Sequence, residues 1–263
     1  MAGRFARLEF EEERERHTQG VSHAAREGVG ERNYLAEADE CFRWGRFEEA
    51  LRLYTRALNE DRMLIPAWVG QVQMLVELDE CHEAKVWSDK ALELFRGQGD
   101  LLAGKAQACA RLYDHKTALA CSDASLEADG SSPWRWIVRG EVLLARGDRH
   151  PEACFEKALA EKAADWFDRV LIARVYRFHR RITNALVYLK EAAQLAPEHG
   201  YVWFETGCCQ RELGMIAAAR ESFGRCFDLR PDYREAQVAL LELEAGGAIR
   251  ARLRGLWRRW RRR

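Results

Sequence analysis

Apolar residues along most of the chain recur at steps of three and four positions, which is the period of an amphipathic helix. The segment 47–58 is an example. Its Ala50, Tyr54 and Ala57 fall on one side of a helix drawn through it. Proline, which interrupts helices, occurs only 5 times in 263 residues. The pattern therefore predicts an all-α chain whose helices each bury one face.

A longer, 34-residue period is superimposed on the helical one. One position of this period holds large side chains, at Tyr34, Trp68, Leu102, Trp136 and, one residue early, Trp203. Two further positions hold small side chains, at Ala50, Ala84, Ala118 and Ala219, and again at Ala57, Ala91, Ser125 and Cys226. The period predicts six units, at 31–64, 65–98, 99–132, 133–165, 166–199 and 200–233.

Such units have a physical reason to stack. A single pair of helices cannot cover its own apolar face, whereas several pairs side by side build one continuous core. Small residues such as Ala50 and Ala57 let neighbouring helices approach closely. Gly45, Gly147 and Gly214 lie where each pair should turn. The sequence therefore predicts an array of stacked helix pairs.

This pattern resembles the tetratricopeptide repeat (TPR) family, whose 34-residue unit consists of two antiparallel helices. The sixth unit carries the resemblance most fully, with Trp203, Gly207, Gly214, Ala219, Phe223 and Pro231. The resemblance covers residues 31–233 and implies a right-handed α-solenoid of stacked antiparallel helix pairs. The nearest alternative is a 35-residue helical repeat that reads RNA. It fits less well, because the spacing is 34 and prolines close units five and six at Pro197 and Pro231.

Units four and five depart from the pattern. Between Gly147 and Ala153, unit four carries an extra turn residue, which predicts a shortened second helix. Unit five has Arg180 at the turn position where glycine is usual, and Arg169 where an aromatic residue is usual. We therefore expect a local change of superhelix twist in this part of the chain.

Three segments flank the six units. Residues 1–30 are rich in charge and predict an N-terminal helical lead or cap. Residues 234–247 predict a closing helix that ends at Gly246 and Gly247. Residues 248–263 form a tail rich in arginine and tryptophan, which we treat separately from the body.

Charge is distributed unevenly along the chain. The 42 Lys and Arg balance 42 Asp and Glu, which argues against a globally basic nucleic-acid binder. Eight arginines and no acid lie in residues 248–263, so the tail carries +8 and the remainder −8. No apolar run approaches the ~18–20 residues of a transmembrane helix, the N-terminus has no signal-peptide core, and the 8 cysteines form no regular framework. These features predict a cytoplasmic protein, and the tail adds a membrane-peripheral location.

Motifs of known enzyme chemistry are missing from the sequence, including the P-loop, the dinucleotide fingerprint, the HExxH zinc motif and the GxSxG nucleophile turn. The cysteines suit packing better than a metal or redox site, with Cys208 the most exposed of them by position. His82 and His115 occupy neighbouring turns and are better explained as surface residues. We therefore expect no catalytic residue, no metal site and no cofactor.

In TPR proteins the first helix of each unit lines a concave groove, so the resemblance implies where partners would bind. Transferred to this chain, the groove positions are Leu35, Asp39, Phe42, Arg43, Val69, Gln73, Gln107, Arg111, Trp134, Ile137, Glu141, Phe167, Arg174, Arg177, Phe178, Tyr201, Phe204 and Arg211. Aromatic residues and arginine are enriched at protein interfaces, and an error of one residue in helix phase would place some of these in the core. The Lys and Asn clamp of chaperone-tail adaptors is absent, so an apolar peptide or helix is the expected guest.

The tail has the pattern of a short cationic amphipathic helix. Ile249, Leu253, Leu256, Trp257 and Trp260 form one apolar stripe, and arginines occupy the other faces. The residues expected to anchor it are Arg250, Arg252, Leu253, Arg254, Trp257, Arg258, Arg259, Trp260 and Arg261. Three interpretations stay open: an anionic membrane surface, an acidic protein or RNA, and docking on the chain's own acidic body.

Together these features predict a non-catalytic scaffold or adaptor. It would bind protein partners in the groove, and its tail would anchor the complex to an anionic membrane or an acidic partner. The alternative is a recruitment factor associated with RNA or another nucleic acid, in which the tail binds and the array recruits. No small-molecule substrate is expected.

Overall fold

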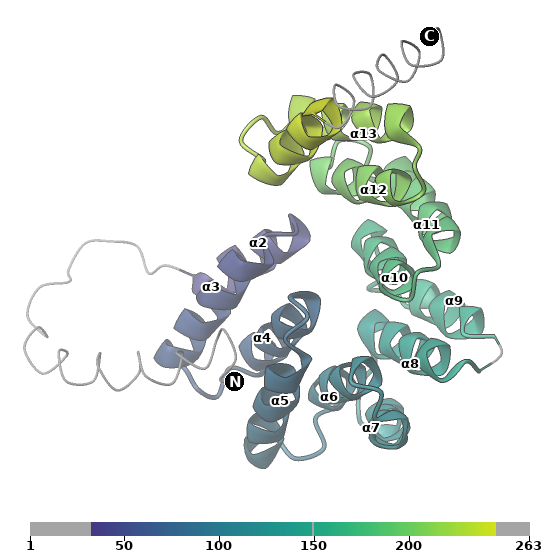
Figure 1. Cartoon of the computed structure of the whole chain (residues 1–263). Coiled ribbons are helices and arrows are strands. Elements are labelled where there is room, and N and C mark those ends of the chain that lie inside the picture. The colour runs from purple at the N-terminus through teal and green to yellow at the C-terminus, as the bar shows by residue number, and fades with distance from the viewer. Residues whose placement is uncertain (1–32, 149, 246–263) are drawn as a thin grey trace, which may run out of the picture. The chain divides into compact units, whose positions relative to one another are not determined.

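A computed structural model describes residues 33–148 and 150–245 (Figure 1). All regular elements in these ranges are α-helices, in agreement with the sequence pattern. The helices divide between two compact blocks, residues 1–161 and 162–263, which we call the N-terminal and C-terminal blocks. The expected lead at 1–30 and the tail at 248–263 lie outside the described residues.

The N-terminal block consists of four helix pairs. Its helices are α2 (Tyr34–Arg43), α3 (Phe47–Glu60), α4 (Ile65–Glu77), α5 (Cys81–Leu94), α6 (Gly99–Arg111), α7 (His115–Glu127), α8 (Pro133–Arg146) and α9 (Glu152–Ala160). Each first helix packs against its own partner and against the next first helix, so that α4, α6 and α8 form a row (Figure 1). This is the stacked arrangement of an α-solenoid.

The C-terminal block contains two further pairs and a closing segment. Its helices are α10 (Trp166–Phe178), α11 (Ile182–Leu195), α12 (Gly200–Glu212) and α13 (Ile216–Leu229), followed by helical residues 234–245. That last segment packs Ala239 and Leu243 against the buried Phe223 and its neighbours, and so covers the end of the block's core. The glycines expected to stop it, at 246 and 247, lie outside the described ranges.

The fourth pair is irregular. Helix α9 has 9 residues, whereas the other second helices have 13 or 14. The turn before it runs from residue 147 to residue 151, while the other pairs turn within three residues. The shortened second helix expected from the sequence is therefore present.

The same backbone turn closes every first helix. The residue two positions after each first helix ends, or one position after it in the fourth pair, adopts a positive φ, at Gly45, Asp79, Tyr113, Gly147, Arg180 and Gly214; the longer fourth turn has a second such residue, His150. These positions recur every 34 positions, with one step of 33, so the turn follows the sequence period. In each turn the amide after this residue donates to the carbonyl five residues earlier, as Arg46 does to Cys41 at 2.9 Å. The geometry is a Schellman-type helix end, in which glycine is usual but not required.

Two tryptophans of the 34-residue period fix the loops that precede them. Trp68 Nε1 donates to the carbonyl of Arg62 at 2.9 Å, and Trp203 Nε1 donates to the carbonyl of Pro197 at 2.7 Å. Both bonds reach back six residues, from the start of a first helix to the preceding loop. A large side chain with one N–H donor suits this position because it fills the junction and satisfies a loop carbonyl.

Close packing within pairs explains two of the glycines. A Cβ atom on Gly140 would overlap the ring of Phe155, and one on Gly207 would lie 2.7 Å from Phe223 Cδ1. In each case a ring from the second helix lies directly on the backbone of the first.

Over residues 33–148 and 150–245, no helix is both long and apolar enough to cross a bilayer.

Candidate functional site

The row of first helices in the N-terminal block carries a polar ladder at its centre. Residues 34 positions apart in neighbouring first helices lie side by side, so Gln107 of α6 meets Glu141 of α8. Gln107 Nε2 donates to Glu141 Oε2 at 2.7 Å. The exposed fraction of Glu141 is 0%, so this carboxylate depends entirely on protein partners.

Arg111 of α6 provides the charge that Glu141 needs. Its Nε lies 2.7 Å from Glu141 Oε1, its Nη1 donates to the carbonyl of Val76 at 2.9 Å, and its Nη2 lies 3.9 Å from Glu77 Oε1. Burial by itself would lower the pKa of Arg111, but the two glutamates outweigh burial and raise it. The guanidinium therefore stays charged and ties three successive first helices together.

A second polar cluster lies between α10 and α12 in the C-terminal block. Arg174 Nη1 is 2.5 Å from Glu205 Oε1, and Arg177 Nη1 is 3.0 Å from Glu205 Oε2. Tyr201 donates its hydroxyl proton to Glu205 Oε1 at 2.7 Å. Arg177 also contacts Glu212 at 2.6 Å through its Nε. One buried carboxylate thus holds two arginines in place.

The ionisation of Glu205 follows from these contacts. Burial would raise the pKa of Glu205, but the charges of Arg174 and Arg177 and the hydrogen bond from Tyr201 outweigh burial and lower it. Desolvation is the main reason that the pKa of Tyr201 is raised well above its usual value, so its hydroxyl remains a donor. Glu205 is consequently an anion wherever the block is folded at neutral pH.

Several predicted groove residues are buried and belong to the packing of the first helices. These are Phe42, Gln107, Trp134, Ile137, Glu141, Phe167 and Tyr201. Trp134, for example, packs with Val138 and Cys109 in a core cluster of the N-terminal block. The assignment of these side chains to an open surface is therefore corrected: stacking brings successive first helices close enough to cover them.

The other predicted groove residues keep part of their surface. They are Leu35, Asp39, Arg43, Val69, Gln73, Arg174, Arg177, Phe178, Phe204 and Arg211. The remaining predicted residue, Arg111, has a side chain that is only 5% exposed, because its guanidinium is enclosed by its partners on α4 and α8. Asp39 accepts a hydrogen bond from the Tyr54 hydroxyl at 2.6 Å, and burial raises its pKa. Arg211 pairs with Glu242 at 2.9 Å, and Phe204 packs partly against Phe223.

Phe178, by contrast, is 39% exposed. It is the one large apolar side chain that the described first helices leave exposed. The other exposed large apolar side chains of the described residues lie on second helices, such as Val86, Val187 and Leu229, or in turns, loops and the closing segment.

Sequence reasoning missed Glu205, Glu212 and Arg135. Glu205 and Glu212 lie 28 to 35 residues after the arginines they contact. A search for opposite charges about one repeat apart would have found them.

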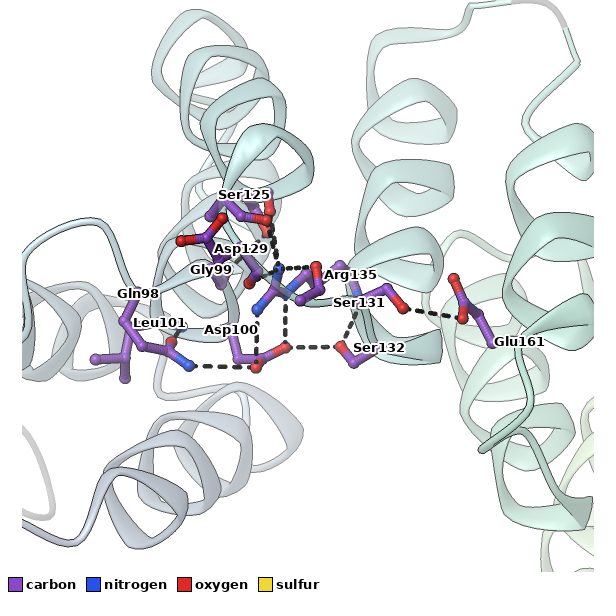
Figure 2. A network of polar contacts seen from close by, with 12 residues as sticks. Gln98, Gly99, Asp100, Leu101, Ser125, Asp129, Ser131, Ser132, Arg135 and Glu161 are labelled. Carbon is purple, nitrogen blue, oxygen red and sulfur yellow. Dashed lines mark hydrogen bonds and ion pairs between the residues drawn. The ribbon is translucent and has the colours of Figure 1, made fainter.

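Arg135 of α8 forms a third network, in which Figure 2 shows Asp100 and a set of loop carbonyls around its guanidinium. Its Nε lies 3.0 Å from Asp100 Oδ1, and its Nη1 donates to the carbonyl of Gly130 at 2.9 Å and to three other carbonyls. Although burial acts to raise the pKa of Asp100, hydrogen bonds from Arg135 and Ser132 lower it. These partners lie in α6, in α7 and in the loop after α7. The network therefore fixes the junction of α6, α7 and α8.

The cysteines give no sign of reactivity. Cys208, expected from its position to be the most exposed, is buried, because α13 and the closing segment pack on that side of α12. Burial raises the pKa of the Cys208, Cys209 and Cys226 thiols to about 12. Among the described residues, no group of three His, Cys, Asp or Glu could hold a metal ion.

Comparison with known proteins gives matches of limited extent. A family model described as tetratricopeptide repeat matches residues 201–233. The chain is 32% identical over 125 residues to "Protein CTR9 homolog" of Arabidopsis thaliana, covering 46% of this chain and 12% of that protein. It is 27% identical over 157 residues to "Superkiller complex protein 3" of Mus musculus, covering 58% of this chain and 10% of that protein. The chain thus spans about a tenth of the length of these relatives.

A solved structure supports the architecture. A tetratricopeptide repeat protein from Parabacteroides merdae superposes with a TM-score of 0.50 at 17% sequence identity. The match covers 80% of this chain and 83% of that one. At this identity the similarity concerns the fold alone, and the fold is the same all-α solenoid of helix pairs.

Proposed function

We propose that the chain, which matches the tetratricopeptide repeat model at residues 201–233 and has the solenoid fold of such proteins, is a non-catalytic scaffold that binds a protein partner through its first-helix face. The observation that carries the proposal is Phe178, an exposed aromatic side chain at the end of α10. Beside it in sequence, Arg177 is held by Glu205 and Glu212. Aromatic side chains, phenylalanine included, and arginine are both enriched at protein interfaces.

The ordering of the arginine supports the proposal physically. A side chain that is already fixed loses little conformational entropy when a partner binds. The Arg177 side chain is 28% exposed and bonded on two sides, so it can meet a partner carbonyl or carboxylate without rearrangement. An apolar peptide or helix would cover Phe178, and its polar groups would meet Arg177 and Arg211.

Membership of a larger assembly fits this proposal. The name of the mouse relative places that protein in a complex. Stacked helix pairs offer a long surface to which partners can bind. We propose a cytoplasmic location on the sequence features alone.

For residues 248–263 we propose an anchoring role. Eight arginines and two tryptophans in so short a segment suit an anionic membrane surface or an acidic partner. The second candidate function is recruitment to RNA through the same tail, which its arginine content also favours.

Partner capture from native lysate tests the scaffold proposal. The proteins compared are the full chain, Phe178→Ala, and Val187→Ala, which removes an exposed apolar side chain from a second helix of the same block. We expect Phe178→Ala to reduce recovery of the principal partner by about tenfold, which corresponds to about 1.4 kcal/mol. Val187→Ala should recover the partner normally. Equal recovery by all three folded proteins would refute the role of the first-helix face.

Deletion of residues 248–263, with and without nuclease, tests the tail separately. Partners that both the full and the shortened chain retain would be bound by the array. Associations lost on deletion and sensitive to nuclease would support RNA recruitment. Associations lost on deletion but insensitive to nuclease would support a lipid or acidic-protein anchor, which binding to vesicles containing phosphatidylserine would distinguish.

A further inference from the structure

A cavity of about 290 Å³ lies in the N-terminal block between the second helices α3 and α5. Its walls come from these two helices, from α4 and from the loop before α4. None of the predicted groove residues lines it, so it is separate from the first-helix face. A volume of this size accommodates one large side chain or a small aromatic molecule.

Two indole rings form the apolar walls of the cavity. The ring centroids of Trp68 and Trp87 are 5.9 Å apart, and Leu58 and Leu94 complete the apolar lining. Because the indole N–H of Trp68 already donates to the carbonyl of Arg62, Trp68 offers the cavity only its ring carbons. An aromatic guest would therefore meet the ring surface of Trp68, and on the other wall the Trp87 ring with the Lys90 ammonium 4.4 Å from its centroid.

Gln71 is the most deeply buried lining residue, with an exposed fraction of 1%. Its Nε2 lies 3.4 Å from Thr55 Oγ1, and the Thr55 hydroxyl donates its own proton to the carbonyl of Leu51 at 2.9 Å. Thr55 can consequently only accept from Gln71, and this fixes the orientation of the amide. Gln71 Oε1 is left as a buried acceptor without a hydrogen-bond partner.

The repeat itself supplies a comparison for this site. The positions equivalent to Gln71 and Thr55 in the next pair are Lys105 and Asp89, whose Nζ and Oδ1 are 2.6 Å apart.

One pair further along, the equivalent residues are Arg139 and Asp123, with Nη1 and Oδ1 2.5 Å apart. Of these three junctions between helix pairs, only the first, formed by Thr55 and Gln71, has two shorter neutral side chains in place of an ion pair. That replacement accounts for the unsatisfied acceptor and for unfilled space beside it.

We propose that this cavity is a recognition pocket for a tyrosine side chain of a partner segment that carries acidic residues next to the tyrosine. The phenol ring would lie against Trp68 and Trp87, and its hydroxyl would donate to Gln71 Oε1. The exposed Arg62 and the half-buried Lys90 line the cavity as cations, against one acid, Glu93, so the charged lining has a net positive charge. This balance favours a neighbouring aspartate or glutamate on the guest.

A short peptide tests the pocket directly. The probe is the acetylated and amidated pentapeptide Gly-Asp-Tyr-Asp-Gly, titrated into the full chain while the indole N–H resonances are followed by NMR. We expect the signals of Trp68 and Trp87 to shift and those of Trp136 and Trp203 to stay. Replacing tyrosine by phenylalanine in the peptide should weaken binding about tenfold, because Gln71 Oε1 then loses its donor. Replacing both aspartates by asparagine should weaken it several-fold.

The repeat also suggests the matched variants. The double substitution Thr55→Asp with Gln71→Lys installs the ion pair of the next junction, so the protein should fold with an unchanged or higher melting temperature and lose peptide binding. The reverse change at the next junction, Asp89→Thr with Lys105→Gln, should leave binding intact. Should the first double variant not fold, Gln71→Leu provides the same test of the acceptor.

Three results would overturn the proposal. They are the absence of any shift at Trp68 and Trp87, equal affinity for the tyrosine and phenylalanine peptides, and undiminished binding by the folded double variant. Since the pocket and Phe178 lie in different blocks, failure here would leave the first-helix proposal standing, and the reverse also holds.

Discussion

At the scale of single residues, the turn that recurs about every 34 positions shows how strongly the fold can impose a backbone conformation on a residue. The left-handed region suits glycine, because other residues bring Cβ too close to the backbone there. Asp79, Tyr113 and Arg180 nevertheless adopt it. The Schellman-type bonds and the packed helix pair hold these residues in a conformation that they disfavour on their own.

Tyr113 is the clearest case for a test. Its side chain is 81% exposed and its φ is +63°, so it contributes backbone strain with little burial to offset it. We expect Tyr113→Gly to raise the free energy of unfolding by about 0.5–1 kcal/mol, measured by urea denaturation. Gly214→Ala, at the equivalent turn of the sixth pair, should lower the free energy of unfolding by a similar amount. A destabilised Tyr113→Gly protein would mean that the ring contributes more than its exposure indicates.

At the scale of helices, the junctions between pairs are fixed by buried charge as well as by apolar packing. Arg135 joins α8 to the first turn of α6 and to the loop after α7 (Figure 2). Its planar guanidinium can bond Asp100 and several carbonyls at the same time. Gly99 leaves room for it, since a Cβ atom there would overlap the guanidinium.

Arg135→Leu should therefore lower the free energy of unfolding by about 3–5 kcal/mol, because it leaves the Asp100 carboxylate and the loop carbonyls partly buried without their donor. Arg135→Lys should recover only part of the loss, since one ammonium cannot reach both sets of acceptors. Arg139→Leu, which removes a more exposed ion pair on the same helix, is the control and should cost about 1 kcal/mol or less. Denaturant midpoints at pH 7 provide the measurement, and equal losses for Arg135→Leu and Arg139→Leu would refute this role.

At the scale of the whole molecule, ionisation should limit the pH range of stability on both sides. The pKa values of Glu205 and Asp100 are lowered in the folded chain by their arginine partners. A lowered pKa means that the stabilisation is present above the unfolded pKa and is lost as pH falls through the folded value. The buried Cys208 and Cys209 thiols have the opposite shift, to a pKa of about 12, so their contribution is lost as pH rises above about 9.

The melting temperature measured by circular dichroism should thus have a plateau near neutral pH and fall below about pH 4 and above about pH 9. Glu205→Gln should flatten the acid limb and lower the plateau, since the charges of Arg174 and Arg177 would then lack their buried partner. An acid limb of unchanged slope in this variant would show that other carboxylates control acid unfolding.

The amino-acid sequence by itself determined the all-α class, the 34-residue repeat and the positions where helix pairs turn. These depend on local periodicity and on small or aromatic residues at fixed spacing, which a linear reading can detect. It also indicated the short α9, because an additional turn residue is visible in the chain.

Only the tertiary structure decided which first-helix side chains are exposed and which charges meet. Trp134 and Phe178 were both expected in the groove, yet Trp134 packs in the core and Phe178 faces solvent. The same limit applies to Glu205 and to Gln71, whose roles depend on residues 16 to 31 positions away. Burial and pairing of this kind arise from the stacking of one helix pair on the next, and the amphipathic pattern of a single helix does not contain that information.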